Sequence, residues 1–237
     1  LTNLAPDTEY FYVVGTGETN LAGGADYHFR TAPTRTKPTR IWALSDYGTT
    51  GTEPIYGFEE NAVGVRNAYL AYVGSHPADV WLTMGDNSQT TGTDADYQSQ
   101  VFDIYPAILR CTPMWPTIGN HDAAYFPTRF EYTNVFSPPT RGEAGGVPSG
   151  TKSYYSYDYA NIHFVSLDAV TVPITNGGPM LTWLEQDLAA NDTIRCVRIC
   201  LSEHQNEQDF SKHHFPSRQA RHDSIHGPSL RSWFSYA

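Results

Sequence analysis

The spacing of apolar and polar residues changes along the chain and divides it into an all-β start and a longer α/β stretch. Residues 10–14 and 27–31 have strand patterns on either side of a loop at 15–24, which predicts a β-hairpin. A segment rich in proline and threonine follows at 33–39 and has the composition of a linker. We therefore predict a first segment over 1–32 and a second domain that begins at residue 40.

From residue 40, short apolar runs alternate with stretches in which apolar residues recur three and four positions apart. The predicted strands are 41–44, 80–83, 114–118, 153–159, 162–167 and 195–201, and the predicted helices are 61–75, 94–109 and 180–190. This alternation is typical of βαβ units, so we predict a layered α/β fold over 40–201. Residues 202–237 show no periodicity and predict an irregular or misread tail.

Composition and charge limit the classes of partner. The 237 residues carry a formal net charge of -10, which disfavours nucleic acid and anionic membrane as partners. An anionic small molecule would also be repelled, unless a bound cation reverses the local field. No apolar run is long enough for a transmembrane helix.

Three predicted strands end at side chains that offer an oxygen ligand: Asp46, Asp86 and Asn120. The carboxyl ends of strands line the ligand crevice in layered α/β folds, and oxygen donors suit Mn, Mg or Fe. Gly85 and Gly119 precede two of these residues and permit a sharp turn. A single Asp after a strand is more often a turn residue, but the ordered set favours a metal site.

The ordered set resembles the metallophosphoesterases. Within that group, the order Leu-x-Pro-Asp-Thr-x-Tyr-x-Tyr-x-Val at 4–14 resembles the late strands of a fibronectin type III domain and narrows the likeness to the purple acid phosphatases. Residues 115–122, 154–168 and 183–188 match later blocks of that family, so the resemblance runs from residue 1 to about 191. It implies a layered β-sandwich metallophosphoesterase domain, after a partial fibronectin-like segment whose remainder is expected upstream.

The resemblance also implies the chemistry. Asp86 would bridge two metal ions, Asp46 would bind one and Asn120 the other, while His121 would donate a proton to the leaving oxygen or stabilise the transition state. The metals would be Fe paired with Zn, Mn or Fe. The expected reaction is hydrolysis of small phosphate monoesters by a metal-activated hydroxide, in a secreted or periplasmic protein.

Two departures from the family pattern leave alternatives open. Gln89 stands where the family has a metal-binding Tyr, which puts iron(III) in doubt. His204 and His213 compete for the next metal-binding His, and no Gly-His-x-His pair follows before Ala237. The alternatives are an inactive module that binds phosphate, metal or a partner, and a phosphodiesterase on the same scaffold.

His163 lies within a predicted strand and is expected to be structural. The oligomeric state stays open.

Overall fold

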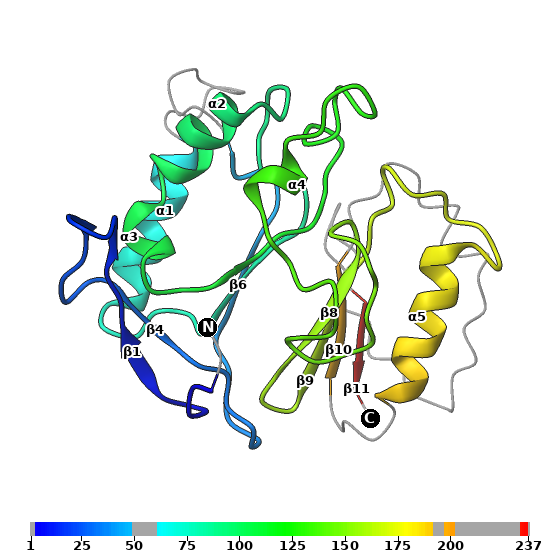
Figure 1. Cartoon of the computed structure of the whole chain (residues 1–237), viewed down its shortest axis with the longest axis horizontal. Coiled ribbons are helices and arrows are strands. Elements are labelled where there is room, and N and C mark those ends of the chain that lie inside the picture. The colour runs from blue at the N-terminus through cyan, green and yellow to red at the C-terminus, as the bar shows by residue number, and fades with distance from the viewer. Residues whose placement is uncertain (1–2, 49–60, 192–196, 202–232, 237) are drawn as a thin grey trace.

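Two β-sheets face each other in the middle of the molecule, and helices cover their outer faces (Figure 1). The structure is a computed structural model, and it describes residues 3–48, 61–191, 197–201 and 233–236. The layers are helix, sheet, sheet and helix, in agreement with the predicted layered α/β class.

The first sheet is parallel and contains the strands that lead into the candidate metal ligands. Its order is β5 (Ile41–Leu44), β6 (Val80–Thr83) and β7 (Met114–Trp115). All four residues of the central strand β6 are buried. Helix α1 (Asn61–Val73) lies on the outer face and agrees with the predicted helix.

The predicted continuous helix at 94–109 is wrong, because the segment is broken into three pieces. These are α2 (Asp94–Tyr97), the π-helical turn η1 (Gln98–Phe102) and α3 (Pro106–Leu109). Thr93 begins α2 with a capping box, in which its side chain accepts from Asp96 N. Pro106 has no amide hydrogen, so it starts a new helix more readily than it continues an old one.

The second sheet is mixed and has the order β11-β10-β9-β8. Its strands are β8 (Tyr155–Tyr159), β9 (Ile162–Ser166), β10 (Val197–Leu201) and β11 (Trp233–Tyr236). Strands β8 and β9 form the predicted hairpin, and α5 (Pro179–Ala190) lies on the outer face of this sheet. Strand β11 is the described part of the predicted irregular tail at 202–237, whose other residues lie outside the described part of the chain. It pairs antiparallel with β10, and four residues are too few to show an alternation in the sequence.

The two sheets pack through large apolar side chains. Trp115 of β7 stacks on Tyr157 of β8 with ring centroids 3.5 Å apart and an interplanar angle of 6°. Val80 and Leu82 of β6 belong to the same buried cluster as Phe164 of β9. This cluster fixes the first sheet, and with it the three strand ends, against the second sheet.

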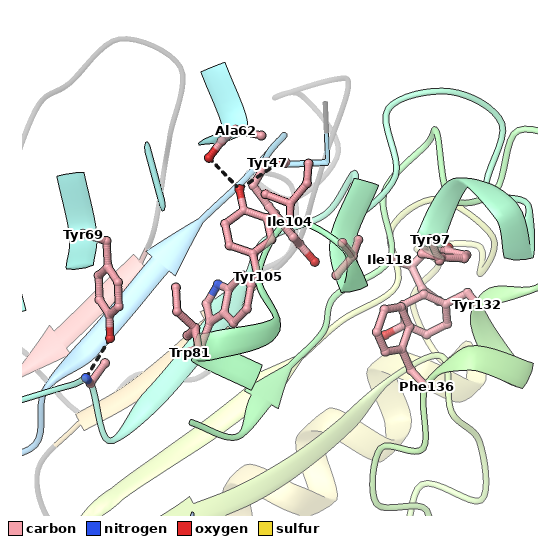
Figure 2. Packing of buried hydrophobic residues seen from close by; sticks show 13 residues of the cluster. Tyr47, Ala62, Tyr69, Trp81, Tyr97, Ile104, Tyr105, Ile118, Tyr132 and Phe136 are labelled. Atoms are coloured by element: carbon pink, nitrogen blue, oxygen red, sulfur yellow. Dashed lines mark hydrogen bonds between the residues drawn. The ribbon is translucent and has the colours of Figure 1, made fainter. Parts of the chain in front are cut away.

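A second cluster, rich in aromatic residues, lies between the first sheet and its helices (Figure 2). Trp81 packs against Tyr47 and Tyr105, with centroids 5.3 and 5.1 Å apart. Tyr105 donates to the carbonyl of Tyr47 at 3.1 Å. Tyr132, in the single-turn helix α4 (Tyr132–Val135), donates to the carbonyl of Pro116 at 2.8 Å. The hydroxyl groups tie the loops around the candidate site to the core.

The N-terminal segment forms two small antiparallel pairs. The predicted hairpin is present as β1 (Glu9–Phe11) with β4 (His28–Arg30). The predicted loop at 15–24 is partly wrong, because β2 (Val14–Gly15) pairs with β3 (Asn20–Ala22). The segment contacts the α/β domain where Tyr12 donates to the carbonyl of Arg110 at 3.0 Å. None of the described helices has the length and apolar character needed to cross a membrane.

Candidate metal centre

The three predicted ligands follow neighbouring parallel strands at one edge of the first sheet. Asp46 follows β5, Asp86 follows β6 and Asn120 follows β7. The amide of Asp46 donates to the carbonyl of Gly85 at 3.4 Å, so the first two loops are in contact. The amide of His121 donates to Asp86 Oδ1 at 2.8 Å, which places the third loop beside the second. The structure therefore brings the loops that carry all four predicted site residues to one place.

Both aspartates have a left-handed backbone conformation. The φ angle is 55° at Asp46 and 47° at Asp86, and Gly85 between the strand and Asp86 has a φ of 103°. Residues other than glycine pay about 1–3 kcal/mol for such a conformation, although Asp tolerates it better than most. Strained residues of this kind cluster at functional sites, because the surrounding structure must hold them in place.

Gly48 allows the first two loops to approach closely. A Cβ atom at Gly48 would lie 1.9 Å from the carbonyl oxygen of Asn87, a distance that no side chain tolerates. The amide of Gln89 donates to the carbonyl of Gly48 at 3.2 Å, which holds the two loops together. The second residue after Asp46 is thus glycine for a packing reason.

Asp122 is a buried acceptor that joins the second and third loops. Its Oδ2 accepts from Asn87 Nδ2 at 2.8 Å and from the amide of Gly119 at 2.9 Å, and its Oδ1 accepts from the hydroxyl of Tyr97 at 2.8 Å. Burial raises the pKa of Asp122 to about 6, although these hydrogen bonds to its charged form act against the increase. Asp122 is 2% exposed, so it is a buried residue that joins the loops through hydrogen bonds.

Asn87 completes this buried network. Its Oδ1 accepts from Tyr47 at 2.8 Å and from Thr83 at 2.6 Å, and its Nδ2 also donates to the carbonyl of Thr117 at 2.8 Å. The sequence motifs include both Asn87 and Asp122, but sequence analysis gave neither of them a role. Their partners lie as many as 40 positions away, so only the fold identifies the network.

Gln89 lies beside Asp46. Its side-chain amide donates to Asp46 Oδ1 at 3.0 Å, and its backbone amide donates to Gln100 Oε1 at 2.8 Å. The hydroxyl of Ser45 donates to the other oxygen of Asp46 at 2.5 Å. The position that the purple acid phosphatases fill with Tyr therefore faces a candidate ligand in this chain also.

His121 presents its ring beside Asp86. Its Nε2 lies 3.8 Å from Asp86 Oδ2, which is too long for a hydrogen bond, and its Nδ1 lies 3.5 Å from the carbonyl of Thr90. The side chain is 40% exposed, whereas that of Asp86 is 4% exposed. A dissolved substrate can therefore reach the imidazole, while the carboxylate lies deeper.

The donor set is suited to a hard cation. Asp46, Asp86 and Asn120 offer carboxylate and amide oxygens, which Mg²⁺ and Mn²⁺ prefer. No three His, Cys, Asp or Glu side chains gather as a metal site in the part of the chain that the structure describes. The candidate set contains only two carboxylates, and a second cation would need further ligands. His204 and His213, the two alternatives for the next metal-binding His, both fall outside the described residues.

His163 lies in the second sheet and links three elements. It is fully buried in β9, with Nδ1 2.6 Å from Asp158 Oδ1 of β8 and Nε2 2.7 Å from Asp187 Oδ2 of α5. Burial alone would lower the pKa of His163, but the two carboxylates outweigh it and raise this pKa to about 9. These contacts agree with the structural role expected for His163.

Comparison with known proteins supports the predicted resemblance. The chain is 29% identical over 195 residues to purple acid phosphatase 22 of Arabidopsis thaliana, covering 80% of this chain and 39% of the relative. It is 26% identical over 218 residues to purple acid phosphatase 21 of the same plant, covering 90% of this chain and 44% of the relative. It is 28% identical over 220 residues to purple acid phosphatase 15 of Arabidopsis thaliana, covering 81% of this chain and 38% of the relative. No family model matches the chain.

The fold comparison points the same way. The solved structure of purple acid phosphatase PPD1 from yellow lupin (Lupinus luteus) seeds matches with a TM-score of 0.51 and 19% sequence identity, covering 80% of this chain and 35% of that one. The chain has a metallophosphoesterase α/β fold and is similar to purple acid phosphatases, as predicted. It spans about two fifths of the length of the curated relatives that it matches.

Proposed function

We propose that this chain carries the metal-binding loops of an acid phosphatase that hydrolyses phosphate monoesters at a dinuclear centre. The observation that supports this proposal is the convergence of Asp46, Asp86, Asn120 and His121 at the carboxyl ends of three adjacent parallel strands. The similarity to purple acid phosphatases supplies the reaction class.

Each residue has a defined task in this proposal. The amide of His121 holds Asp86, which would be a ligand to both metal ions, while Asp46 would hold one ion and Asn120 the other. When bound, the ions supply a hydroxide near neutral pH and neutralise charge on the phosphoryl oxygens. His121 donates a proton to the leaving oxygen, because its ring is open to solvent and imidazole is a common general acid in enzymes.

The first test is hydrolysis of 4-nitrophenyl phosphate by the full chain with added Mn²⁺, Fe²⁺ or Zn²⁺. We expect turnover that a chelator removes and that Asp86→Ala lowers by at least about a hundredfold, because the shared ligand is lost. Asp26→Asn is the matched control, since Asp26 is an exposed residue of the N-terminal segment. Equal rates for Asp86→Ala and the parent chain would show that the assignment is wrong.

One contact favours a second function, that of a non-catalytic module that binds phosphate or a single cation. The amide of Gln89 donates to Asp46 and occupies one of its oxygens, where the family places a phenolate. Elemental analysis of the purified chain separates the two functions. Two tightly bound metals per chain support the enzyme, and one or none supports the module.

We also propose that residues 1–32 are part of a fibronectin type III-like domain, that 33–39 link it to the catalytic domain over 40–201, and that the protein is secreted. The amide of Ala5 donates to the hydroxyl of Tyr10 at 2.8 Å, which is the contact of a tyrosine corner in such sandwiches. Tyr10→Phe tests the corner, and we expect the N-terminal segment to become more susceptible to limited proteolysis while 61–191 stays protected.

A further inference from the structure

A guanidinium group and two exposed aromatic rings lie on the turn that follows His121. Tyr125 is 48% exposed and Phe126 is 47% exposed, although large aromatic residues are usually covered. Arg129 is also exposed, and its guanidinium carbon lies 4.3 Å from the centre of the Tyr125 ring. The proposed metal centre uses none of these three side chains.

Backbone hydrogen bonds fix this turn relative to His121. The amide of Ala124 donates to the carbonyl of His121 at 3.3 Å, and the amide of Arg129 donates to the carbonyl of Tyr125 at 3.0 Å. The hydroxyl of Thr128 donates to the same carbonyl of Tyr125 at 2.7 Å. The backbone that carries the exposed side chains is therefore held by hydrogen bonds within the turn.

Arg129 and His121 contact consecutive carbonyl groups. Arg129 Nη2 lies 3.5 Å from the carbonyl of Thr91, and His121 Nδ1 lies 3.5 Å from the carbonyl of Thr90. The guanidinium and the predicted proton donor are therefore both held by the same loop. Arg129 thus adds a guanidinium that is hydrogen-bonded to the loop after β6. It supplies a fixed positive charge in a chain whose net charge is -10.

We infer that Arg129, positioned by Tyr125, binds a second anionic group on the leaving part of the substrate. The inference rests on the proposed function and names its substrate class: phosphate monoesters that carry a carboxylate or another phosphate on the leaving group. The guanidinium has five N–H donors in a planar fork that matches either anion, and one contact to Thr91 leaves most of them free. Stacking on Tyr125 holds the fork in place without using those donors.

Two phosphonates that cannot be hydrolysed test this inference by isothermal titration to the full chain in Mn²⁺. They are benzylphosphonate and 4-carboxybenzylphosphonate, which differ only in the second anionic group. We expect the carboxylated compound to bind about tenfold more tightly to the parent chain, as a charge-assisted contact at an exposed site allows. Arg129→Gln should remove this preference and leave the affinity for benzylphosphonate unchanged, while Arg129→Lys should keep part of it.

Two variants control for structural effects. Arg141→Gln removes another exposed arginine and should keep the full preference. Tyr125→Phe should keep it as well, whereas Tyr125→Ala should reduce it, because the guanidinium loses the ring that orients it. Circular dichroism of each variant checks that it folds.

Three results would overturn the inference: equal affinity of the parent chain for the two phosphonates, no binding of either, or a preference that survives in Arg129→Gln. The chain could also bind 4-carboxybenzylphosphonate more tightly through Arg129 and yet fail to hydrolyse 4-nitrophenyl phosphate. That result would contradict the proposed function but support the anion site at Arg129.

Discussion

For Asp46 and Asp86, the sequence indicates the chemistry of the side chain, and the structure gives the conformation of the backbone. Their positions just after apolar strands are visible in the sequence and predict oxygen ligands at one sheet edge. Their positive φ angles are not visible there, because Asp occurs in many turn conformations. The structure adds that both are held in a conformation that L residues rarely adopt.

Gly48 provides a test of this local geometry. Gly48→Ala places a methyl group 1.9 Å from the carbonyl oxygen of Asn87, so one of the two loops must move. We expect the free energy of unfolding to fall by about 2 kcal/mol or more in urea titrations. Gly17→Ala is the control, because no atom lies within 4 Å of a Cβ at Gly17. A Gly48→Ala chain as stable as the Gly17→Ala chain would contradict the loop contact.

Gln89 affects how the chain is expected to bind iron(III). Its amide faces Asp46 and cannot act as a phenolate, so the chain should bind ferric iron without a strong visible colour. Gln89→Tyr should introduce a visible absorption band when iron(III) is added, because the phenolate would lie beside Asp46. Visible spectra of both chains with iron(III) check this, with Gln89→Phe as the control for ring size. A Gln89→Tyr chain that stays colourless would show that position 89 does not reach the metal.

At the scale of elements, the sequence pattern predicted α1, α5 and the β8–β9 hairpin closely, because these are among the longer helices and strands of the fold. It failed at 94–109, where Pro106 and a π-helical turn divide one apparent helix. It also missed the β2–β3 pair, whose few residues carry no pattern of their own. Short elements depend on their neighbours more than on their own sequence.

His163 joins β8, β9 and α5, and its charge makes their packing sensitive to pH. Its pKa is raised to about 9 in the folded chain, so the folded state keeps a proton that the unfolded state releases above its ordinary value of 6.5. The stability from this group is fully present below pH 6.5 and is lost as the pH rises to about 9. The loss amounts to about 3 kcal/mol at most.

Urea titrations across this pH window measure the effect. The parent chain should lose stability steadily between pH 6.5 and 9. His163→Gln should be less stable at pH 6, because Asp158 and Asp187 lose a charged partner, and its stability should change little over the same window. A parent chain with a flat profile would mean that His163 is neutral in the fold.

At the scale of the whole molecule, the sandwich of two sheets places the metal loops on a rigid base. The sequence indicates which residues are apolar, but it does not show that Trp115 stacks on Tyr157 or that Asp122 holds Asn87. These contacts join parts of the chain that are 35 or more residues apart, and only the fold brings them together. The candidate ligands stay a prediction from the sequence, and each of them follows a strand of the same parallel sheet.

The central claim is that Asp46, Asp86 and Asn120 meet closely enough to hold a cation together. Equilibrium dialysis of the full chain against Mn²⁺, with metal content measured by elemental analysis, tests it most directly. We expect the parent chain and Asp26→Asn to bind Mn²⁺ equally, and Asp86→Ala to bind it at least about tenfold more weakly. Equal Mn²⁺ binding by Asp86→Ala and the parent chain, or no binding by either, would contradict the account.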